Sequence, residues 1–169
     1  MNTQPTSVIN IARHILLAES DGMTIMKLQK LCYLAQSYSL AWTGERLITE
    51  RFYTRRNGSY NKELATALKG IYLVYYSDLK YTPKLPDPVT GNKAIIVEQV
   101  DKTMRGVSSS SLRNIFQNET PLQAGLKNKS GNYIISETAM RDYYNDDRKA
   151  KLGIKPNMFK SATNTERRI

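Results

Sequence analysis

The chain has very little cysteine and histidine: among its 169 residues, Cys32 and His14 are the only ones of their types. A single cysteine excludes a disulfide within the chain, so the sequence suits a reducing compartment. One cysteine and one histidine leave no cluster with metal-ligand spacing. Both residues fall within helical patterns, so we expect a packed thiol and an ordinary helical histidine, not a catalytic pair.

Other signatures of enzymes are missing as well. The nine glycines are scattered singly, which excludes a glycine-rich phosphate-binding loop. Asp146 and Asp147 are adjacent, and adjacent residues on a helix point about 100° apart, which excludes a dyad that shares one proton. We therefore expect a protein that is not an enzyme and that uses no cofactor.

Long apolar runs are absent too. No run approaches the about 20 residues that a membrane-spanning helix needs, and no basic segment followed by an apolar stretch opens the chain. The mean hydropathy is −0.50. These features predict a cytoplasmic protein without a membrane partner.

Positive charge is abundant but unevenly placed. The net charge is +10, and residues 148–169 carry seven basic residues against Glu166, which gives +6 in the tail alone. We expect a domain over 1–147 and a basic, poorly structured tail over 148–169. Such a tail predicts nucleic-acid binding as an alternative function, although no helix-turn-helix, zinc-finger or RNP pattern accompanies it.

Apolar residues recur at three- and four-residue steps along most of the chain, which predicts helices. We expect mainly α structure with a small β-sheet (α+β), as a compact domain of about six helices and a short two- or three-stranded sheet. The expected helices cover 7–17 with Thr6 or Ser7 as N-cap, 24–44 with Thr24 as N-cap and Gly44 as terminator, 64–75 and 93–104. Three further helices are expected: a segment capped by Ser111, a segment starting at Thr120-Pro121 and a last one capped by Ser136.

Strand formers concentrate in residues 47–53, and the Asn57-Gly58 dipeptide that follows is the strongest turn signal in the chain. Residues 133–135 are a second short run of strand formers. We expect residues 133–135 to pair with residues 47–53.

The order of residues in the long helix is more informative than its periodicity. Residues 27–36 read K-L-Q-K-L-x-Y-x-A-Q and are followed by a T-G turn at Thr43-Gly44, which resembles the opening of the Panacea domain, an antitoxin domain also described as SocA-like. Upstream, residues 7–17 fit the first helix of that family. Downstream, Leu112-Arg113-Asn114-Ile115, then Pro121, then residues 131–137 follow the family's order, so the resemblance covers residues 7–145.

This resemblance implies a bacterial antitoxin that neutralises a toxin by direct contact or presents it for proteolysis. The chain departs from the family pattern at three places. The Y-G-P-V run is replaced within residues 52–60, a histidine is replaced by Gln117, and a P-W pair by Pro121-Leu122. These departures suggest an alternative: a phage-encoded inhibitor of a host or defence protein on the same scaffold.

Tyrosine is the aromatic residue in excess, with eleven copies against one tryptophan and three phenylalanines. Tyrosine and arginine dominate the hot spots of protein interfaces, and both types are concentrated between residues 51 and 60. The alternative is that several of these tyrosines lie at the edge of the core and take no part in an interface. As a group, we expect the partner-binding surface to comprise Arg51, Tyr53, Arg55, Arg56, Asn57 and Tyr60.

Overall fold

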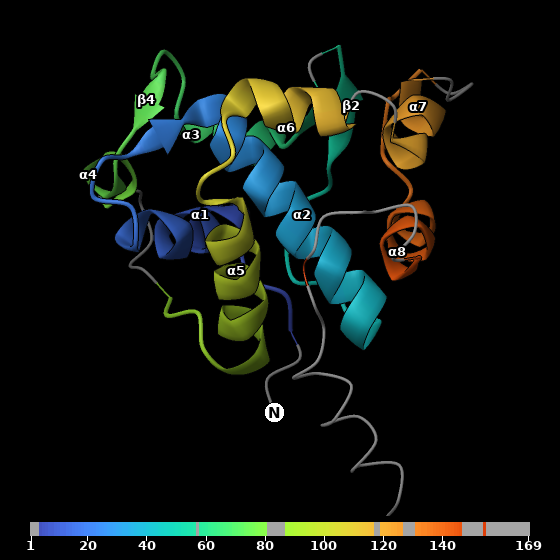
Figure 1. Cartoon of the computed structure of the whole chain (residues 1–169), viewed down its shortest axis with the longest axis horizontal. Helices are drawn as coiled ribbons and strands as arrows, with labels where there is room; N and C mark the ends of the chain where they lie inside the picture. Colours follow the sequence, from blue (N-terminus) through green and yellow to red (C-terminus); the bar gives the residue numbers. More distant parts are fainter. Residues whose placement is uncertain are drawn as a thin grey trace, which may run out of the picture.

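The computed structural model describes residues 4–56, 58–80, 87–116, 119–126, 131–146 and 154. Within these residues the chain forms eight helices and two antiparallel two-stranded sheets (Figure 1), which confirms the predicted α+β fold class. The elements in chain order are α1 (Val8–Leu17), β1 (Met23–Thr24), α2 (Ile25–Thr43), β2 (Tyr53–Arg55), β3 (Gly58–Tyr60), α3 (Lys62–Ala67), β4 (Leu73–Val74), α4 (Tyr76–Leu79), α5 (Gly91–Met104), α6 (Ser109–Phe116), α7 (Thr120–Leu126) and α8 (Glu137–Asn145).

Helix α2 is the centre of the fold. It crosses the molecule with α1 and α5 on one side and α8 on the other (Figure 1), and α6 also packs against it. Every residue from 28 to 40 is buried, so this helix is covered on all sides, as its apolar flanks predict. Thr24 accepts from the Lys27 amide as N-cap, and Gly44 ends the helix at φ 74°, as predicted.

The predicted cap of the last helix is also confirmed, and of the two candidate caps of the first helix, Thr6 and Ser7, the structure has Ser7. Ser7 accepts from the Asn10 amide at the start of α1, and Ser136 accepts from the Ala139 amide at the start of α8. The helix that contains Leu112 begins earlier than predicted, because Ser108, not Ser111, accepts the amide hydrogen bond at its start.

Two predicted elements are wrong. The expected helix over 64–75 is broken: α3 ends at Ala67, Gly70 has φ 83°, and β4 then pairs with β1. The expected strand over 47–53 is largely an irregular connection. Its Leu47 and Ile48 amides donate hydrogen bonds to the side chain of Gln36 on α2. Tertiary partners override the local pattern at both places.

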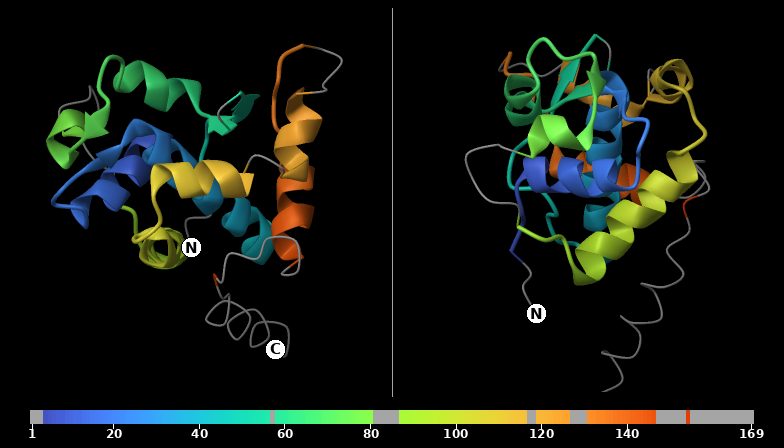
Figure 2. Two further views of the ribbon diagram at one scale, coloured as in Figure 1. Left: turned by 45° about the horizontal axis from the view of Figure 1, so that its top comes forward. Right: turned by 90° about the vertical axis from the view of Figure 1, so that its left-hand side faces the viewer.

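The β2–β3 hairpin lies beside α7, which stands in line with α8 at one end of the molecule (Figure 2). Residues 133–135 meet the hairpin as predicted, but at 52–54: the Thr54 amide donates to the Tyr133 carbonyl at 2.8 Å and the Ile135 amide to the Phe52 carbonyl at 3.0 Å. Tyr53 and Ile134 form an isolated antiparallel bridge. This end of the hairpin is therefore fixed by the segment that leads into α8.

The core is built around the ring of Tyr33 on α2. Its ring meets the rings of Phe52, Phe116 and Tyr144 edge to face, with centroids 5.7, 5.9 and 6.2 Å away. Ile154 is buried and belongs to the same core. The other residues of the predicted tail, 148–153 and 155–169, lie outside the described residues.

Candidate functional site

The predicted partner-binding segment forms the β2–β3 hairpin and its entry. Tyr53 pairs with Tyr60, Thr54 with Ser59, and Arg55 with Gly58. Because side chains alternate across a strand, the two tyrosines share a face with Arg55, and Thr54 and Ser59 point to the opposite, inner face. Thr54 and Ser59 are buried, whereas Arg55 is exposed.

Cations lie over the aromatic rings of the outer face. The Arg55 guanidinium is 3.8 Å from the centroid of the Tyr60 ring, and the Lys62 ammonium is 4.1 Å from that of Tyr53. Both distances suit cation–π contacts. The hairpin therefore brings Tyr53, Arg55 and Tyr60 together in one preorganised surface.

The remaining predicted residues have different surroundings. Arg56 is exposed at the end of β2, and Asn57 lies outside the described residues. Arg51 is exposed as well, but it forms an ion pair with Glu137 of α8, which also binds Arg46 at 2.9 Å. Arg51 thus joins two parts of the fold.

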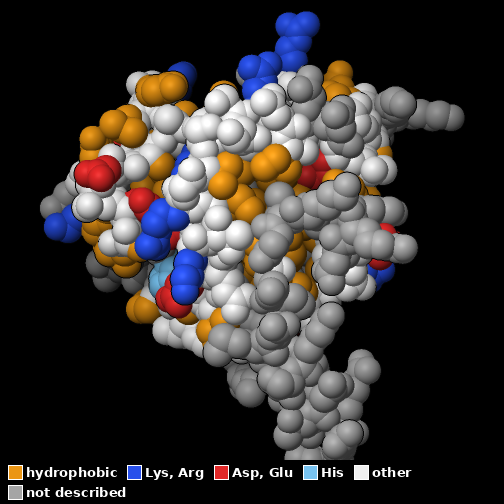
Figure 3. All heavy atoms as spheres, in the orientation of Figure 1, with side chains coloured by type: hydrophobic (Ala, Val, Ile, Leu, Met, Phe, Trp, Pro, Cys, Tyr) orange, Lys and Arg blue, Asp and Glu red, His pale blue; other side chains and the backbone are white. Residues whose placement is uncertain are grey.

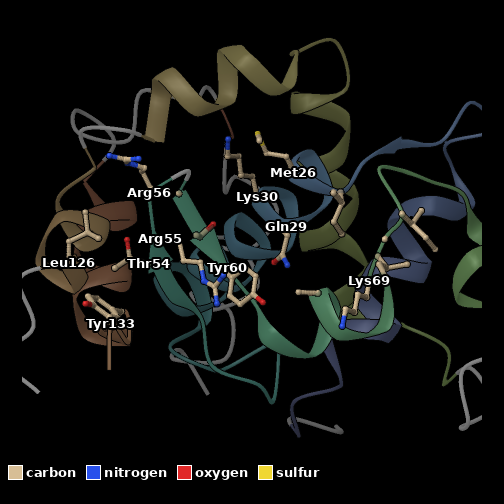
Figure 4. A pocket seen from close by; sticks show the side chains of 17 residues that line it. Met26, Gln29, Lys30, Thr54, Arg55, Arg56, Tyr60, Lys69, Leu126 and Tyr133 are labelled. Carbon is tan, nitrogen blue, oxygen red and sulfur yellow. The ribbon is translucent and has the colours of Figure 1, made fainter. Parts of the chain in front are cut away.

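A cleft of about 880 Å³ opens between the hairpin and the first half of α2 (Figure 4), and we call it the hairpin cleft. An adjoining hollow of about 400 Å³ shares Thr54, Arg55, Arg56, Gly58 and Leu126 with it and reaches Arg113 of α6. The hairpin cleft is lined by Ile25, Met26, Gln29, Lys30, Thr54, Arg55, Arg56, Gly58, Ser59, Tyr60, Ala65, Leu68, Lys69, Gly70, Ile71, Leu126 and Tyr133.

The charge of these walls is of one sign. Lys30, Arg55, Arg56 and Lys69 line the cleft, and Arg113 lines the adjoining hollow. Among the described residues, no aspartate or glutamate lines either one. Lysine and arginine side chains also project from the edge of the molecule near α6 and β2 (Figure 3). The cleft is therefore suited to a negatively charged group.

Lys30 is the functional candidate that the sequence analysis missed. Its residue is 1% exposed, and its Nζ has no hydrogen-bond partner among the described residues. Burial, together with the nearby Arg113 guanidinium, lowers the pKa of Lys30 to about 8. A signal was present in the sequence: a lysine within a helix that is apolar on all sides must be buried and needs a partner.

The rim of the cleft carries exposed apolar groups. Leu126 is 43% exposed and Tyr133 is 49% exposed, and both lie at the hairpin side of the cleft (Figure 4). Tyr133 also has φ 59°, an uncommon conformation for an aromatic residue, and its carbonyl oxygen is held by Thr54. Backbone strain of this kind often occurs at binding sites.

Comparison with family models, with curated proteins and with solved structures gives no match to this chain. The properties of the candidate site therefore come from its own geometry. Across the described residues, no helix combines the length and the apolar character that a membrane span requires. Nor do three His, Cys, Asp or Glu side chains of that part of the chain lie together as metal ligands would.

Cys32 and His14 lie apart from the cleft. Cys32 is fully buried in the core, and burial raises the pKa of its thiol, which keeps the thiol protonated and unreactive. His14 is at the surface, 3.1 Å from Glu98 of α5. Both residues thus have structural surroundings, as the sequence predicts.

A buried carboxyl group, Glu119, was also missed. It is 2% exposed and accepts from the hydroxyls of Tyr33 and Tyr144, each at 2.6 Å. Burial raises its pKa to about 7, against the lowering effect of the two hydrogen bonds. Because it joins α2, the start of α7 and α8 inside the core, we assign it to the scaffold.

Proposed function

We propose that this chain is a protein-binding domain of the Panacea type that neutralises a toxin by direct contact or presents it for proteolysis. The observation that carries the proposal is the hairpin surface: arginine and tyrosine side chains stacked in fixed geometry beside a cationic cleft with an apolar rim. Arginine and tyrosine anchors of this kind dominate protein interfaces. The order of motifs along the chain supplies the resemblance to antitoxins.

The mechanism is steric and electrostatic. Tyr53 and Tyr60 offer large side chains with few rotatable bonds, and the cations above them restrict them further, so little conformational entropy is lost on binding. Arg56 extends the surface into solvent and accelerates the approach of an acidic partner. A toxin held here would have its active site covered by the hairpin end of the molecule.

A second form of the proposal is a phage-encoded inhibitor of a host or defence protein. It is favoured by the same segment, since the hairpin is where the residues typical of the family are replaced. A toxin gene beside the gene of this protein would support the antitoxin form, whereas an isolated phage locus would support the inhibitor form.

Site-specific photo-cross-linking tests the proposal. We would place p-benzoylphenylalanine at Tyr60, and as a matched control at Lys102 on the exposed side of α5, and express each full chain in the source cells. We expect one protein to cross-link at high occupancy from the Tyr60 position and not from Lys102. Equal capture at both positions, or recovery of nucleic acid alone, would contradict the proposal.

Growth assays then test neutralisation. The captured protein should arrest growth when it is expressed alone, and co-expression of this chain should restore growth. Replacing Arg56 by glutamate should abolish the rescue, because a reversed charge on the binding face costs affinity. A full-length variant with glutamines in place of the tail's lysines and arginines should still rescue growth. If only that tail variant fails, the basic tail is the functional element, as the nucleic-acid alternative requires.

A further inference from the structure

Within the part of the chain that the structure describes, three polar atoms of the hairpin cleft have no hydrogen-bond partner: Lys30 Nζ, Thr54 Oγ1 and Ser59 Oγ. Their residues are 1%, 2% and 7% exposed. Native proteins pair nearly all of their buried polar groups, so an unpaired buried group is unusual and is a candidate contact for a ligand. Three such atoms in the wall of one cleft mark where the polar groups of a ligand would be bound most strongly.

The three residues come from the two elements that border the cleft: Lys30 from α2, and Thr54 and Ser59 from the hairpin. Thr54 and Ser59 face each other across the hairpin, on its inner face. The Lys30 stem runs against the hairpin next to Ser59, since a Cβ placed on Gly58 would lie 3.4 Å from Lys30 Cε. Figure 4 shows Lys30 reaching up between Met26 and Arg56. The α2 lysine and the hairpin hydroxyls therefore belong to one site.

The surroundings of this site favour an anion over a neutral group. Arg55, Arg56 and Lys69 line the same cleft, and no acidic residue among those described lines it. An ammonium group without a counter-ion is costly to bury, and a carboxylate that approaches it regains that free energy. The lowered pKa of Lys30 reflects this cost.

We propose that the hairpin cleft binds an acidic segment of the partner protein, with an aspartate or glutamate carboxylate at Lys30. The inference rests on the proposed function, because it takes the occupant from a protein partner. The hydroxyl groups of Ser59 and Thr54 donate hydrogen bonds to the carboxylate or to the adjoining peptide carbonyl. Met26 and Arg56 have long side chains that turn aside to admit the segment.

The apolar walls decide between a peptide and a nucleic acid. Met26, Ile71 and Leu126 line the cleft, and Tyr133 lies at its rim. Apolar side chains that flank an acidic residue in a peptide would pack on these walls. A nucleic-acid backbone carries one charge per nucleotide and would instead require cations in a row along a polar groove.

Two capped peptides test the site: acetyl-Ala-Leu-Asp-Leu-Ala-amide and the same peptide with asparagine in place of aspartate. Binding is followed by the NMR shifts of the Gly58 and Ser59 amides of the full chain. We expect the aspartate peptide to bind about 10- to 100-fold more tightly, the range typical of hydrogen bonds to charged groups. Lys30→Met should abolish that preference, and Lys102→Met, on the exposed side of α5, should keep it.

The pKa of Lys30 gives a second measurement that a purely structural role would not change. The charged groups of the cleft and the adjoining hollow are Lys30, Arg55, Arg56, Lys69 and Arg113, and no carboxylate among the described residues lines either one. A bound carboxylate should therefore raise the pKa of Lys30 above about 8, whereas the asparagine peptide should leave it unchanged. The 15N resonance of Lys30 Nζ reports the titration directly.

Several outcomes would overturn the inference. Equal affinity for the two peptides, or no shift of the Gly58 and Ser59 amides with either one, would exclude a carboxylate site. Shifts of those amides by oligothymidylate at lower concentration than by the aspartate peptide would identify a nucleic acid as the occupant.

The outcome for this site can be separated from that for the proposed function. If the chain cross-links a protein from Tyr60 and Lys30→Met binds that protein with unchanged affinity, the carboxylate site is wrong and the proposed function stands. If no protein cross-links from Tyr60 but the chain still prefers the aspartate peptide, the proposed function is wrong and the carboxylate site stands.

Discussion

The two halves of α2 treat their buried polar side chains differently. In the second half, Gln36 accepts from the amides of Leu47 and Ile48 at 2.9 and 2.8 Å and donates to Glu137 at 3.2 Å. In the first half, Lys30 is equally buried, and none of the described residues forms a hydrogen bond with its ammonium group. The buried polar side chain of the second half connects parts of the fold, whereas the ammonium group of Lys30 in the first half does not.

The contrast is not a property of the whole first half. Gln29, next to Lys30, exchanges two hydrogen bonds with the backbone of Asn61, at 3.0 and 2.8 Å. That pair fixes the end of the hairpin against α2. Lys30 therefore lies next to a side chain that fastens the hairpin to α2, which is the kind of support that a binding site requires. The difference between the halves separates residues that build the fold from the one that we propose binds a carboxylate.

Gln36→Met should have the largest effect on stability. It leaves the buried amides of Leu47 and Ile48 without acceptors, and two such losses should lower the free energy of unfolding by about 3 kcal/mol. Urea unfolding followed by circular dichroism measures the change, which should appear as a midpoint more than about 1 M lower. An unchanged midpoint would show that this half of α2 does not depend on its polar contacts.

Glu119→Gln should change how stability depends on pH. The pKa of Glu119 is raised to about 7 from an ordinary 4.5, so between these values the folded state binds more protons than the unfolded state. Stability then falls as pH rises, by about 3 kcal/mol in total. Glutamine keeps an acceptor for one tyrosine hydroxyl and a donor for the other, and it does not titrate.

The measurement is the difference in unfolding free energy between the wild type and Glu119→Gln from pH 4.5 to 8. Taking the difference removes the contribution of other groups, such as Glu19, whose pKa burial also raises. We expect the free energy of unfolding of the wild type to fall steadily relative to that of Glu119→Gln up to about pH 7 and then to level off. A flat difference curve would mean that Glu119 is ionised throughout and that its two tyrosines compensate for its burial.

The sequence predicted the scaffold well wherever one helix carried its own signals. Thr24, Gly44, Ser7 and Ser136 act as helix terminators or caps because capping depends on neighbouring residues alone. The segment 64–75 was mispredicted because its last residues pair with β1, fifty residues earlier in the chain. Pairing over such a distance leaves no local pattern.

Of the candidate site, the sequence indicated the residues on the outer face of the hairpin and not the buried Lys30. Arginine and tyrosine between residues 51 and 60 are informative by type, and the hairpin does bring Tyr53, Arg55 and Tyr60 together. Lys30 was overlooked because the motif of residues 27–36 that contains it served only to indicate the family resemblance. Its lack of a partner depends on where α6 and the hairpin lie, and no spacing in the sequence gives that information.

Lys30→Met should change the free energy of unfolding in the opposite direction to Gln36→Met. Methionine fills a similar volume and removes a buried ammonium without a partner, so the free energy of unfolding should rise by about 1 kcal/mol at pH 7. Because the pKa of Lys30 is lowered to about 8, the gain should grow as pH falls from 10.5 to 8 and stay constant below. Destabilisation by Lys30→Met would show that its ammonium already has a structural role.

Arg51→Ala should have the smallest effect and should show which arginines belong to the binding surface. Arg51 is half exposed and pairs with Glu137, so its loss should cost less than about 0.5 kcal/mol of stability. Glu137 keeps Arg46 and Gln36 as partners when Arg51 is removed, so no buried charge is left unpaired. Thermal unfolding of the full chain measures this.

Partner affinity gives the sharper comparison between arginines. Arg51 already pairs with Glu137 within the fold, whereas Arg56 is exposed and no acidic residue among those described lines its cleft. We therefore expect Arg51→Ala to weaken binding of the cross-linked protein less than Arg56→Ala does, by titration calorimetry. An equal or larger loss at Arg51 would mean that the partner competes with Glu137 for this side chain, and that the satisfied half of the molecule also takes part in binding.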